Sequence, residues 1–147
     1  MTPADRSFFL ALGESELLAR VIWRESANQP LAGQVAVACV PFNRLAAPRI
    51  NYGKTLNNVL LKDAAFSCLD PDDPNYPLMK AGGNSRMLNR CRTIAELSIA
   101  KLLKDPTRME GMTLGATHYH LLTIKPYWRD MLHYLITIGD HKFYLEI

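Results

Sequence analysis

The spacing of apolar residues changes near residue 111, and this change constrains the fold more than any other feature of the chain. Before it, apolar residues recur at the spacing of one buried helix face, for example over residues 17–22. After it, apolar and polar residues alternate in short runs typical of strands, at 117–120, 134–138 and 142–145. Gly139-Asp140, between the last two runs, is a two-residue hairpin signal. The pattern predicts an α+β fold, mainly helical, with a small C-terminal antiparallel sheet.

Capping residues and prolines set the expected helix limits in the first half of the chain. Thr2-Pro3 predicts a helix over 3–12, which Gly13 ends. A second helix stops near residues 25–28, because Pro30 disfavours helical geometry at the residue before it. The third, over 31–46, is rich in Ala and Val and is expected to be the buried central helix.

Three further expectations concern the middle of the chain. Pro41 should kink or split the third helix, because proline removes a helical hydrogen bond. Thr55 can cap a short helix that ends at Leu61. Three prolines and two adjacent glycines predict a long structured loop over 69–84, and the helix that follows ends at Asp105-Pro106.

Length and composition indicate one domain spanning residues 1–147. The chain has 147 residues, and 48% of them are apolar, enough to form one sizeable core. A formal net charge of +3, with acids interleaved among the basic residues, is too mild to indicate nucleic-acid binding. It would suit an anionic polymer such as a bacterial cell wall. We expect a monomer that binds no nucleic acid.

The cysteines and the N-terminal residues indicate in which cellular compartment the protein is made. Cys39, Cys68 and Cys91 are odd in number and widely spaced, which argues against a disulfide framework and a structural zinc site. Residues 1–10 lack the basic start and long apolar stretch of a signal peptide, and no segment is apolar enough to span a bilayer. These features predict synthesis in the cytoplasm without a signal peptide and without stable insertion in a membrane.

Glu25 is the strongest candidate for chemistry. It ends the apolar run 17–26, shortly before the small-residue segment 31–40, so its carboxyl group could be half enclosed and still face a cleft. An acid in that setting can be kept protonated near neutral pH. A solvated glutamate at a helix end is the commoner case. Candidate partners are flat aromatic side chains and hydrogen-bonding groups that would suit a sugar chain, namely Phe66, Tyr119, Tyr127, Trp128, Ser67, Thr117 and His120.

Other groups of residues are weaker candidates for a metal site or a catalytic site. His118 and His120 would share one face of a strand and could bind a metal with His133, His141, Cys68 or Asp70, as in a metal-dependent amidase, although packing histidines are commoner. The acidic loop 70–74 lacks the spacing of a calcium loop. Cys68 has no neighbouring base in the sequence and is expected to be a buried thiol.

Several segments, taken together and in order, resemble the SleB-type cell-wall hydrolase family of spore-cortex-lytic enzymes. The matching segments cover about residues 15–145 and lie at 19–26, 33–38, 43–44, 66–68, 115–120, 126 with 128, and 138–144. The resemblance implies a lysozyme-like lytic transglycosylase fold. It also implies cleavage of the peptidoglycan bond between N-acetylmuramic acid and N-acetylglucosamine with a 1,6-anhydro product.

The resemblance assigns roles to particular residues. Glu25 is the catalytic acid and base, and no cofactor or metal is expected. The expected substrate-binding side chains are Phe66, Ser67, Thr117, Tyr119, His120 and Trp128. The chain departs from the family pattern at Pro41, at Ala65 before the Phe-Ser-Cys segment, and over residues 26–29. A catalytic domain without a signal peptide fits a bacteriophage endolysin that reaches the wall after a holin opens the inner membrane.

Two alternatives to a transglycosylase stay open besides the amidase. One is a hydrolytic muramidase in which Asp63 or Asp70 supplies a second carboxylate and water attacks the sugar. The other is a non-enzymatic module that binds the cell wall or belongs to a virion.

Overall fold

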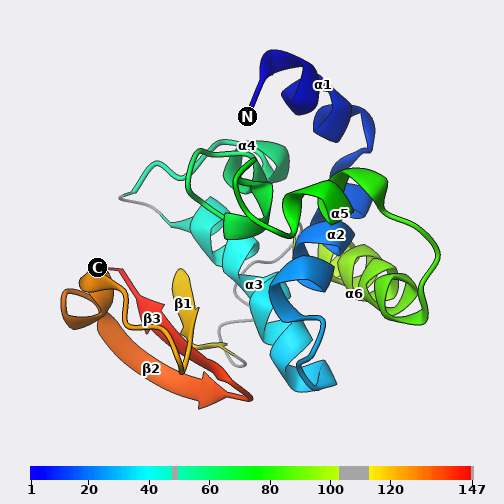
Figure 1. Cartoon of the computed structure of the whole chain (residues 1–147). Helices are drawn as coiled ribbons and strands as arrows, with labels where there is room; N and C mark the ends of the chain where they lie inside the picture. Colours follow the sequence, from blue (N-terminus) through cyan, green and yellow to red (C-terminus); the bar gives the residue numbers. More distant parts are fainter. Residues whose placement is uncertain (48–49, 103–112, 147) are drawn as a thin grey trace.

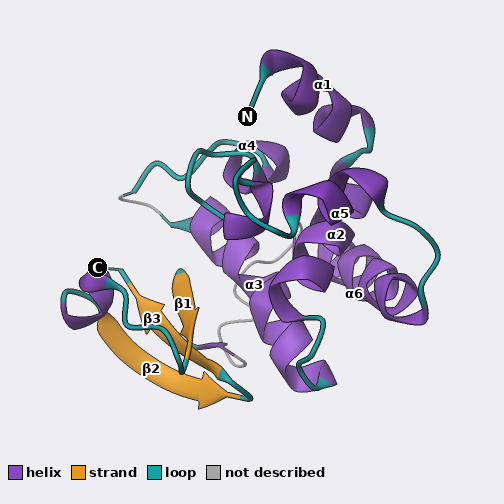
Figure 2. Ribbon diagram, viewed as in Figure 1, coloured by secondary structure: helices purple, strands orange, loops and turns teal. Residues whose placement is uncertain are grey.

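The computed structural model describes residues 1–47, 50–102 and 113–146. A group of helices lies beside a small three-stranded sheet, with α3 between the sheet and the other helices (Figure 1). The elements, in chain order, are α1 (Pro3–Ala11), α2 (Glu14–Ser26), α3 (Leu31–Ala46), α4 (Leu56–Leu60), η1 (Ser67–Leu69), α5 (Tyr76–Ala81), α6 (Arg86–Leu102), β1 (His118–Leu121), η3 (Tyr127–Asp130), β2 (His133–Ile138) and β3 (His141–Leu145). Figure 2 shows the strands grouped on one side of the helices, and all three come from the last third of the chain. The predicted α+β class is confirmed.

The capping predictions for the first helices are confirmed. The hydroxyl of Thr2 accepts a hydrogen bond from the backbone N–H of Asp5 at 3.1 Å, which begins α1. Gly13 separates α1 from α2 with φ of +82°, a backbone conformation that glycine adopts without steric cost. Thr55 caps α4 in the same way as Thr2 caps α1, by accepting from the N–H of Asn58 at 3.1 Å.

Of the two outcomes predicted for Pro41, a kink or a split of the third helix, the split is wrong. α3 continues as one helix from Leu31 to Ala46 with Pro41 inside it. All nine residues from 36 to 44 are buried. Burial of this apolar surface stabilises the helix by more than the one backbone hydrogen bond that proline removes.

The prediction of a continuous loop over 69–84 is wrong in part, because α5 forms within it. The helix starts with a proline near its N-terminus, at Pro77, where the missing N–H costs no helical hydrogen bond. Gly82 ends α5 with φ of +63°. The predicted end of the next helix at Asp105-Pro106 lies outside the described residues, which follow α6 to Leu102.

The sheet has the strand order β1-β3-β2, and both pairings are antiparallel. Ile138 pairs with His141, so the predicted two-residue hairpin at Gly139-Asp140 is confirmed. The side-chain amide of Gln29, from the turn between α2 and α3, exchanges hydrogen bonds with the backbone N–H and the carboxylate of Asp140 at 2.9 and 3.2 Å. A Cβ at Gly139 would lie 2.4 Å from Oε1 of Gln29, so only glycine fits this contact.

The two faces of the sheet have different surroundings. Phe143 packs against Val37, Val40 and other small residues of α3, so this inner face closes a small apolar cluster. Tyr119 packs against that cluster and also against the larger cluster formed by the helices. The outer face carries His118, His120 and Tyr144, which alternate with the inner residues along β1 and β3.

The three cysteines, Cys39, Cys68 and Cys91, are buried. Burial raises the pKa of Cys39 to about 12 and that of Cys91 to about 11, and it raises the pKa of Cys68 as well. Their thiols are therefore protonated at neutral pH. Within the described residues, no helix combines the length and apolar character that crossing a bilayer requires.

Candidate active site

The carboxyl group of Glu25 lies where α2, η1 and β1 meet. Its Oε1 accepts hydrogen bonds from the backbone N–H of Cys68 at 3.2 Å and from the hydroxyl of Ser67 at 3.3 Å. Its Oε2 accepts a hydrogen bond from the hydroxyl of Tyr119 at 2.9 Å. The side chain is half-buried in the last turn of the helix. All three donors are neutral groups, and they fix the position of both carboxyl oxygens.

Local backbone structure explains the contact with η1. Phe66 is the extended residue before this short 3-10 turn, and Ser67 and Cys68 begin it. The first N–H groups of a helical turn have no acceptor within the turn. Glu25 supplies an acceptor for Cys68, so the sequence Phe66-Ser67-Cys68 places both a backbone and a side-chain donor against one carboxyl oxygen.

Tyr119 is the partner that comes from the sheet. Burial, followed by the nearby charge of Glu25, raises the pKa of Tyr119 well above its usual range. The phenol is therefore protonated at neutral pH and can donate to the carboxylate. Its ring packs against His141 and Phe143, with ring centroids 5.1 and 5.7 Å away, so the hydroxyl has little freedom to move.

Arg44 joins the two chain segments that contact Glu25. Its guanidinium donates to the carbonyl of Thr117 at 2.7 Å and to the carbonyl of Ala65 at 3.2 Å, and it lies 4.9 Å from the ring centroid of Phe66. Burial lowers its pKa, and nearby Tyr119, Tyr52 and Glu25 act in the opposite direction. The sequence-based analysis did not assign Arg44 to the site. Two signals could have found it: its place in the central third helix, and segment 43–44, which is one of the segments that resemble the SleB-type family.

A pocket of about 370 Å³ adjoins the site through Ser67. Glu25 is not among the residues that line it. The lining combines an aromatic ring, two carboxylates and a lysine with apolar residues: Met1, Leu61, Lys62, Asp63, Ala64, Phe66, Ser67, Leu69, Asp70 and Pro71. This mixture of flat apolar and polar groups can accommodate a ligand that is itself partly apolar and partly polar.

Three of the predicted substrate-binding residues do not contact Glu25. Thr117 is 2% exposed, and its hydroxyl accepts a hydrogen bond from the backbone N–H of Glu146 at 3.0 Å. His120 lies on the outer face, where its Nε2 is 2.9 Å from the hydroxyl of Tyr144. Trp128 packs against His120 on the same face, with ring centroids 5.7 Å apart. Substrate binding by these three residues stays a prediction.

The histidines considered as weak candidates for metal ligands lie on both faces of the sheet. His118 lies on the outer face beside Glu146 and Tyr52, and burial lowers its pKa. His141 lies on the inner face of the sheet beside Tyr119. Across residues 1–47, 50–102 and 113–146, no three His, Cys, Asp or Glu side chains form a group that could hold a metal ion.

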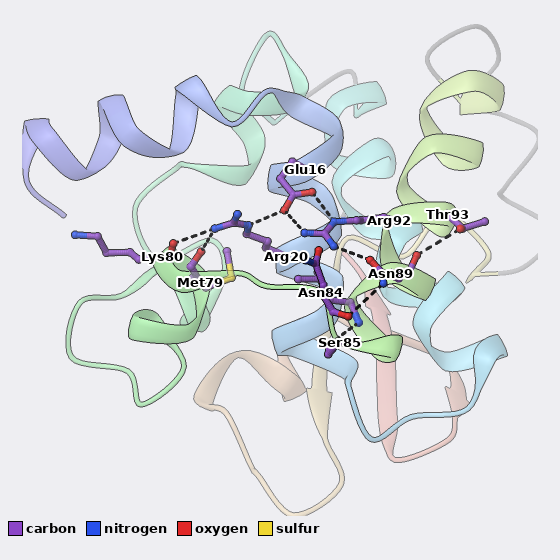
Figure 3. Close-up of polar contacts among 10 residues, drawn as sticks. Glu16, Arg20, Met79, Lys80, Asn84, Ser85, Asn89, Arg92 and Thr93 are labelled. Atoms are coloured by element: carbon purple, nitrogen blue, oxygen red, sulfur yellow. Dashed lines mark hydrogen bonds and ion pairs between the residues drawn. The ribbon is translucent and has the colours of Figure 1, made fainter.

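A second carboxylate of α2, Glu16, has only cationic side-chain partners. It accepts from Arg20 at 2.9 Å and from both Nε and Nη2 of Arg92 at 2.9 Å (Figure 3). Arg20 also donates to the carbonyls of Met79 and Lys80 at 2.8 and 3.1 Å. The network ties α5 and α6 to α2, the helix that carries Glu25.

The same helix face contacts the acidic segment before α5. The guanidinium of Arg24 donates two hydrogen bonds to the side-chain carbonyl of Asn75, at 2.9 and 2.7 Å. Gly82 lets the backbone pass close to Arg20, since a Cβ there would lie 2.5 Å from the guanidinium carbon. Residues 66–82 are therefore held against α2 at Arg20, Arg24 and Glu25.

A family model described as Cell Wall Hydrolase matches residues 28–144, most of the chain. The protein belongs to the cell wall hydrolase family. The match begins three residues after Glu25, so the family model itself does not include this carboxylate. No curated protein sequence is significantly similar to this cell wall hydrolase.

Two solved structures have a similar fold. The catalytic domain of the Bacillus cereus SleB protein is 22% identical, with a TM-score of 0.65 over 90% of this chain and 89% of that chain. The catalytic domain of the germination-specific lytic transglycosylase SleB from Bacillus anthracis is 22% identical, with a TM-score of 0.66 over 90% of this chain and 93% of that chain. This cell wall hydrolase therefore has the fold of the SleB catalytic domains, as predicted.

Proposed function

We propose that this protein cleaves the glycan strand of bacterial peptidoglycan between N-acetylmuramic acid and N-acetylglucosamine, as a lytic transglycosylase. The observation that carries the proposal is the arrangement around Glu25, a half-buried carboxyl group held by three neutral donors. Family membership supports the cell wall as the substrate, and one protein of similar fold is described as a lytic transglycosylase.

In the first step, Glu25 donates its proton to the glycosidic oxygen. The bond between that oxygen and C1 of the muramoyl sugar breaks, and positive charge develops on C1 and the ring oxygen. The carboxylate left on Glu25 is then hydrogen-bonded by Tyr119, Ser67 and the N–H of Cys68. These donors are in place before the reaction, so the site needs no reorganisation as the charge forms.

In the second step, the C6 hydroxyl of the same muramoyl sugar attacks C1. A C–O bond forms within the sugar, and the hydroxyl proton passes to the Glu25 carboxylate, which restores the acid. No water is consumed, and one carboxyl group serves both steps. Phe66 and Ser67, which line the neighbouring pocket, are the proposed contacts for the adjoining part of the strand.

The masses of the products test this proposal directly. Purified cell wall is digested with the wild-type protein and with Glu25→Gln, and the soluble muropeptides are analysed by mass spectrometry. We expect anhydro ends, which are lighter than reducing ends by one water, from the wild type and none from the variant. Anhydro products from Glu25→Gln would refute the role of Glu25.

A hydrolytic muramidase is the second candidate, because Asp63 and Asp70 both line the pocket that includes Ser67. Either carboxylate could activate a water for attack on C1. Reducing ends in the wild-type digest, lost in Asp63→Asn or Asp70→Asn, would favour this candidate. Action as a phage endolysin with a holin, and a monomeric state, stay predictions.

A further inference from the structure

Segment 122–134, which packs on the outer face of the sheet through Trp128 and Tyr134, is rich in exposed apolar side chains. Of the twelve large apolar side chains that are exposed among the described residues, five lie between residues 122 and 134. The most exposed are Tyr127 at 88% and Met131 at 75%, and Tyr134 is 54% exposed. Exposed apolar patches of this kind mark interaction sites on soluble proteins.

These side chains lie over a base of packed rings, formed by Tyr144, Trp128 and His120. Tyr144 is 5% exposed and lies at the centre of the base, where its ring contacts Trp128, Tyr134 and His120 at centroid distances of 5.5, 5.8 and 5.3 Å. Trp128 packs inward in η3, and its neighbour Tyr127 points into solvent. A fixed base reduces the entropy that a ligand-binding surface loses when the ligand binds.

The charges around the patch are mainly positive. Lys142 lies 5.8 Å from the ring centroid of Tyr134, and Lys125 and Arg129 lie in the segment that crosses this face. Arg129 is 3.5 Å from Asp130, the one acidic side chain of that segment. Aromatic rings bordered by cations fit a polymer of sugars, whose C–H faces stack on rings, bearing carboxylates on attached peptides.

This surface lies on the other face of the sheet from Tyr119, the partner of Glu25. Tyr119, which contacts Glu25, projects from the inner face of β1, whereas its neighbours His118 and His120 project from the outer face. We propose that the outer face, defined by Tyr127, Met131 and Tyr134, is a second glycan-binding surface that holds a peptidoglycan strand while Glu25 cleaves at its own site. This inference rests on the proposed function, because it takes peptidoglycan as the substrate.

A second contact would matter most on the intact wall. Binding one part of a polymer raises the local concentration of its remaining strands at the catalytic site, without any new contact at that site. A short soluble glycan that fills only the catalytic site would gain nothing from the outer face. A comparison of insoluble wall with a short glycan therefore distinguishes binding at the outer face from binding at the catalytic site.

The test compares Tyr127→Ala/Tyr134→Ala with the wild type and with a control, Phe8→Ala/Leu97→Ala, which removes exposed apolar side chains from α1 and α6. Binding is measured by co-sedimentation with purified insoluble sacculi in the Glu25→Gln background, so that the wall is not digested. Activity is measured on a soluble peptidoglycan tetrasaccharide with Glu25 intact. Circular dichroism and the melting temperature establish that each variant is folded.

We expect the aromatic double variant to bind sacculi about tenfold more weakly and to turn over the tetrasaccharide within about twofold of the wild type. The control should match the wild type in both assays. Because the cations border the rings, wild-type binding to sacculi should also weaken as salt rises. Sacculi stripped of their stem peptides should show a smaller salt effect.

Three results would overturn the proposal. The first is unchanged binding of the folded double variant to sacculi. The second is an equal loss on the tetrasaccharide, which would make the patch part of the catalytic cleft. The third is a dimer of the wild type that the double variant abolishes, which would make a second copy of this chain the occupant. Failure of the proposed function is distinct, since it would appear as no turnover of the tetrasaccharide by the wild type.

Discussion

The two acids at opposite ends of α2, Glu16 and Glu25, have opposite kinds of partners. Glu16 accepts hydrogen bonds from the guanidinium groups of Arg20 and Arg92. Glu25 accepts hydrogen bonds from a hydroxyl, a phenol and a backbone N–H. The two guanidinium groups lower the pKa of Glu16 and favour its ionised form, which suits a structural role. Neutral donors can hold a carboxyl group before and after it gives up a proton, and this is what acid and base catalysis needs.

The largest expected effect is that of Glu25→Gln. The amide keeps the size of the side chain but cannot deliver or accept the proton, so the release of soluble muropeptides should fall by about 10²- to 10⁴-fold. The melting temperature should stay close to that of the wild type, because the O–H bond of Tyr119 can turn about the C–O bond and the oxygen can accept from the amide while the ring stays in place. Release rates and calorimetry on the same preparation measure both quantities. A folded variant with more than about a tenth of wild-type activity would contradict the proposed role of Glu25 as acid and base.

Glu16→Gln should have the opposite effects on the two quantities, with a lower stability and nearly unchanged activity. The variant loses the charged partner of Arg20 and Arg92, so the free energy of unfolding should fall by about 2 kcal/mol. Muropeptide release at a temperature well below the melting point should stay within about twofold of the wild type, because Glu16 does not touch the proposed site. Urea unfolding measures the stability. Glu14→Gln is the matched control, an acid of the same helix that makes no ion pair with another described residue.

Tyr119→Phe tests the Glu25 partner that comes from β1. The substitution removes the hydroxyl that donates to Oε2 and keeps the ring that packs on both apolar clusters. We expect kcat to fall about tenfold, or about 1.4 kcal/mol, with KM little changed, because the hydroxyl donates to the carboxyl group of Glu25 and positions it. Steady-state kinetics on the soluble tetrasaccharide separates the two constants. A rise in KM alone would place Tyr119 in substrate binding instead.

The pH dependence of stability gives the smallest expected effect. Hydrogen bonds from Arg92, together with those from Arg20, lower the pKa of Glu16 below its ordinary value of 4.5. A lowered pKa in the folded state means that the stabilisation is complete above about pH 4.5 and is lost as the pH falls toward the folded-state pKa. The difference in melting temperature between wild type and Glu16→Gln should therefore narrow below pH 4.5. A difference that stays constant down to pH 3 would show that the charge of Glu16 is not its source.

Local signals in the sequence were enough to predict most of the elements. Thr2, Gly13 and Pro30 set helix limits that the structure confirms within a few residues. Pro41 and Pro77 misled the prediction in different ways. The first is compensated by burial along α3, and the second lies at a helix start, where proline is favourable.

The candidate site was predictable only in part. The alternation of residues 118–120 already implied that Tyr119 and His120 project from opposite faces of a strand, but it could not tell which face meets Glu25. The role of Arg44 depends on carbonyl groups 21 and 73 residues away, and nothing in local spacing encodes such contacts. Residue types and order pointed to the acid, and the tertiary contacts identify its partners.

The hydrogen bonds of Glu25 also order events during synthesis of the chain. Ser67 and Cys68 lie 42 and 43 residues after Glu25, and Tyr119 lies 94 residues after it. At a ribosomal rate of about 5–20 residues per second, translation from Glu25 to Tyr119, its last donor, takes roughly 5–20 s. A chain interrupted before β1 holds the acid without the phenol. The hydrogen bonds of Glu25 are thus complete only when β1, the first of the three strands, has been made and has docked.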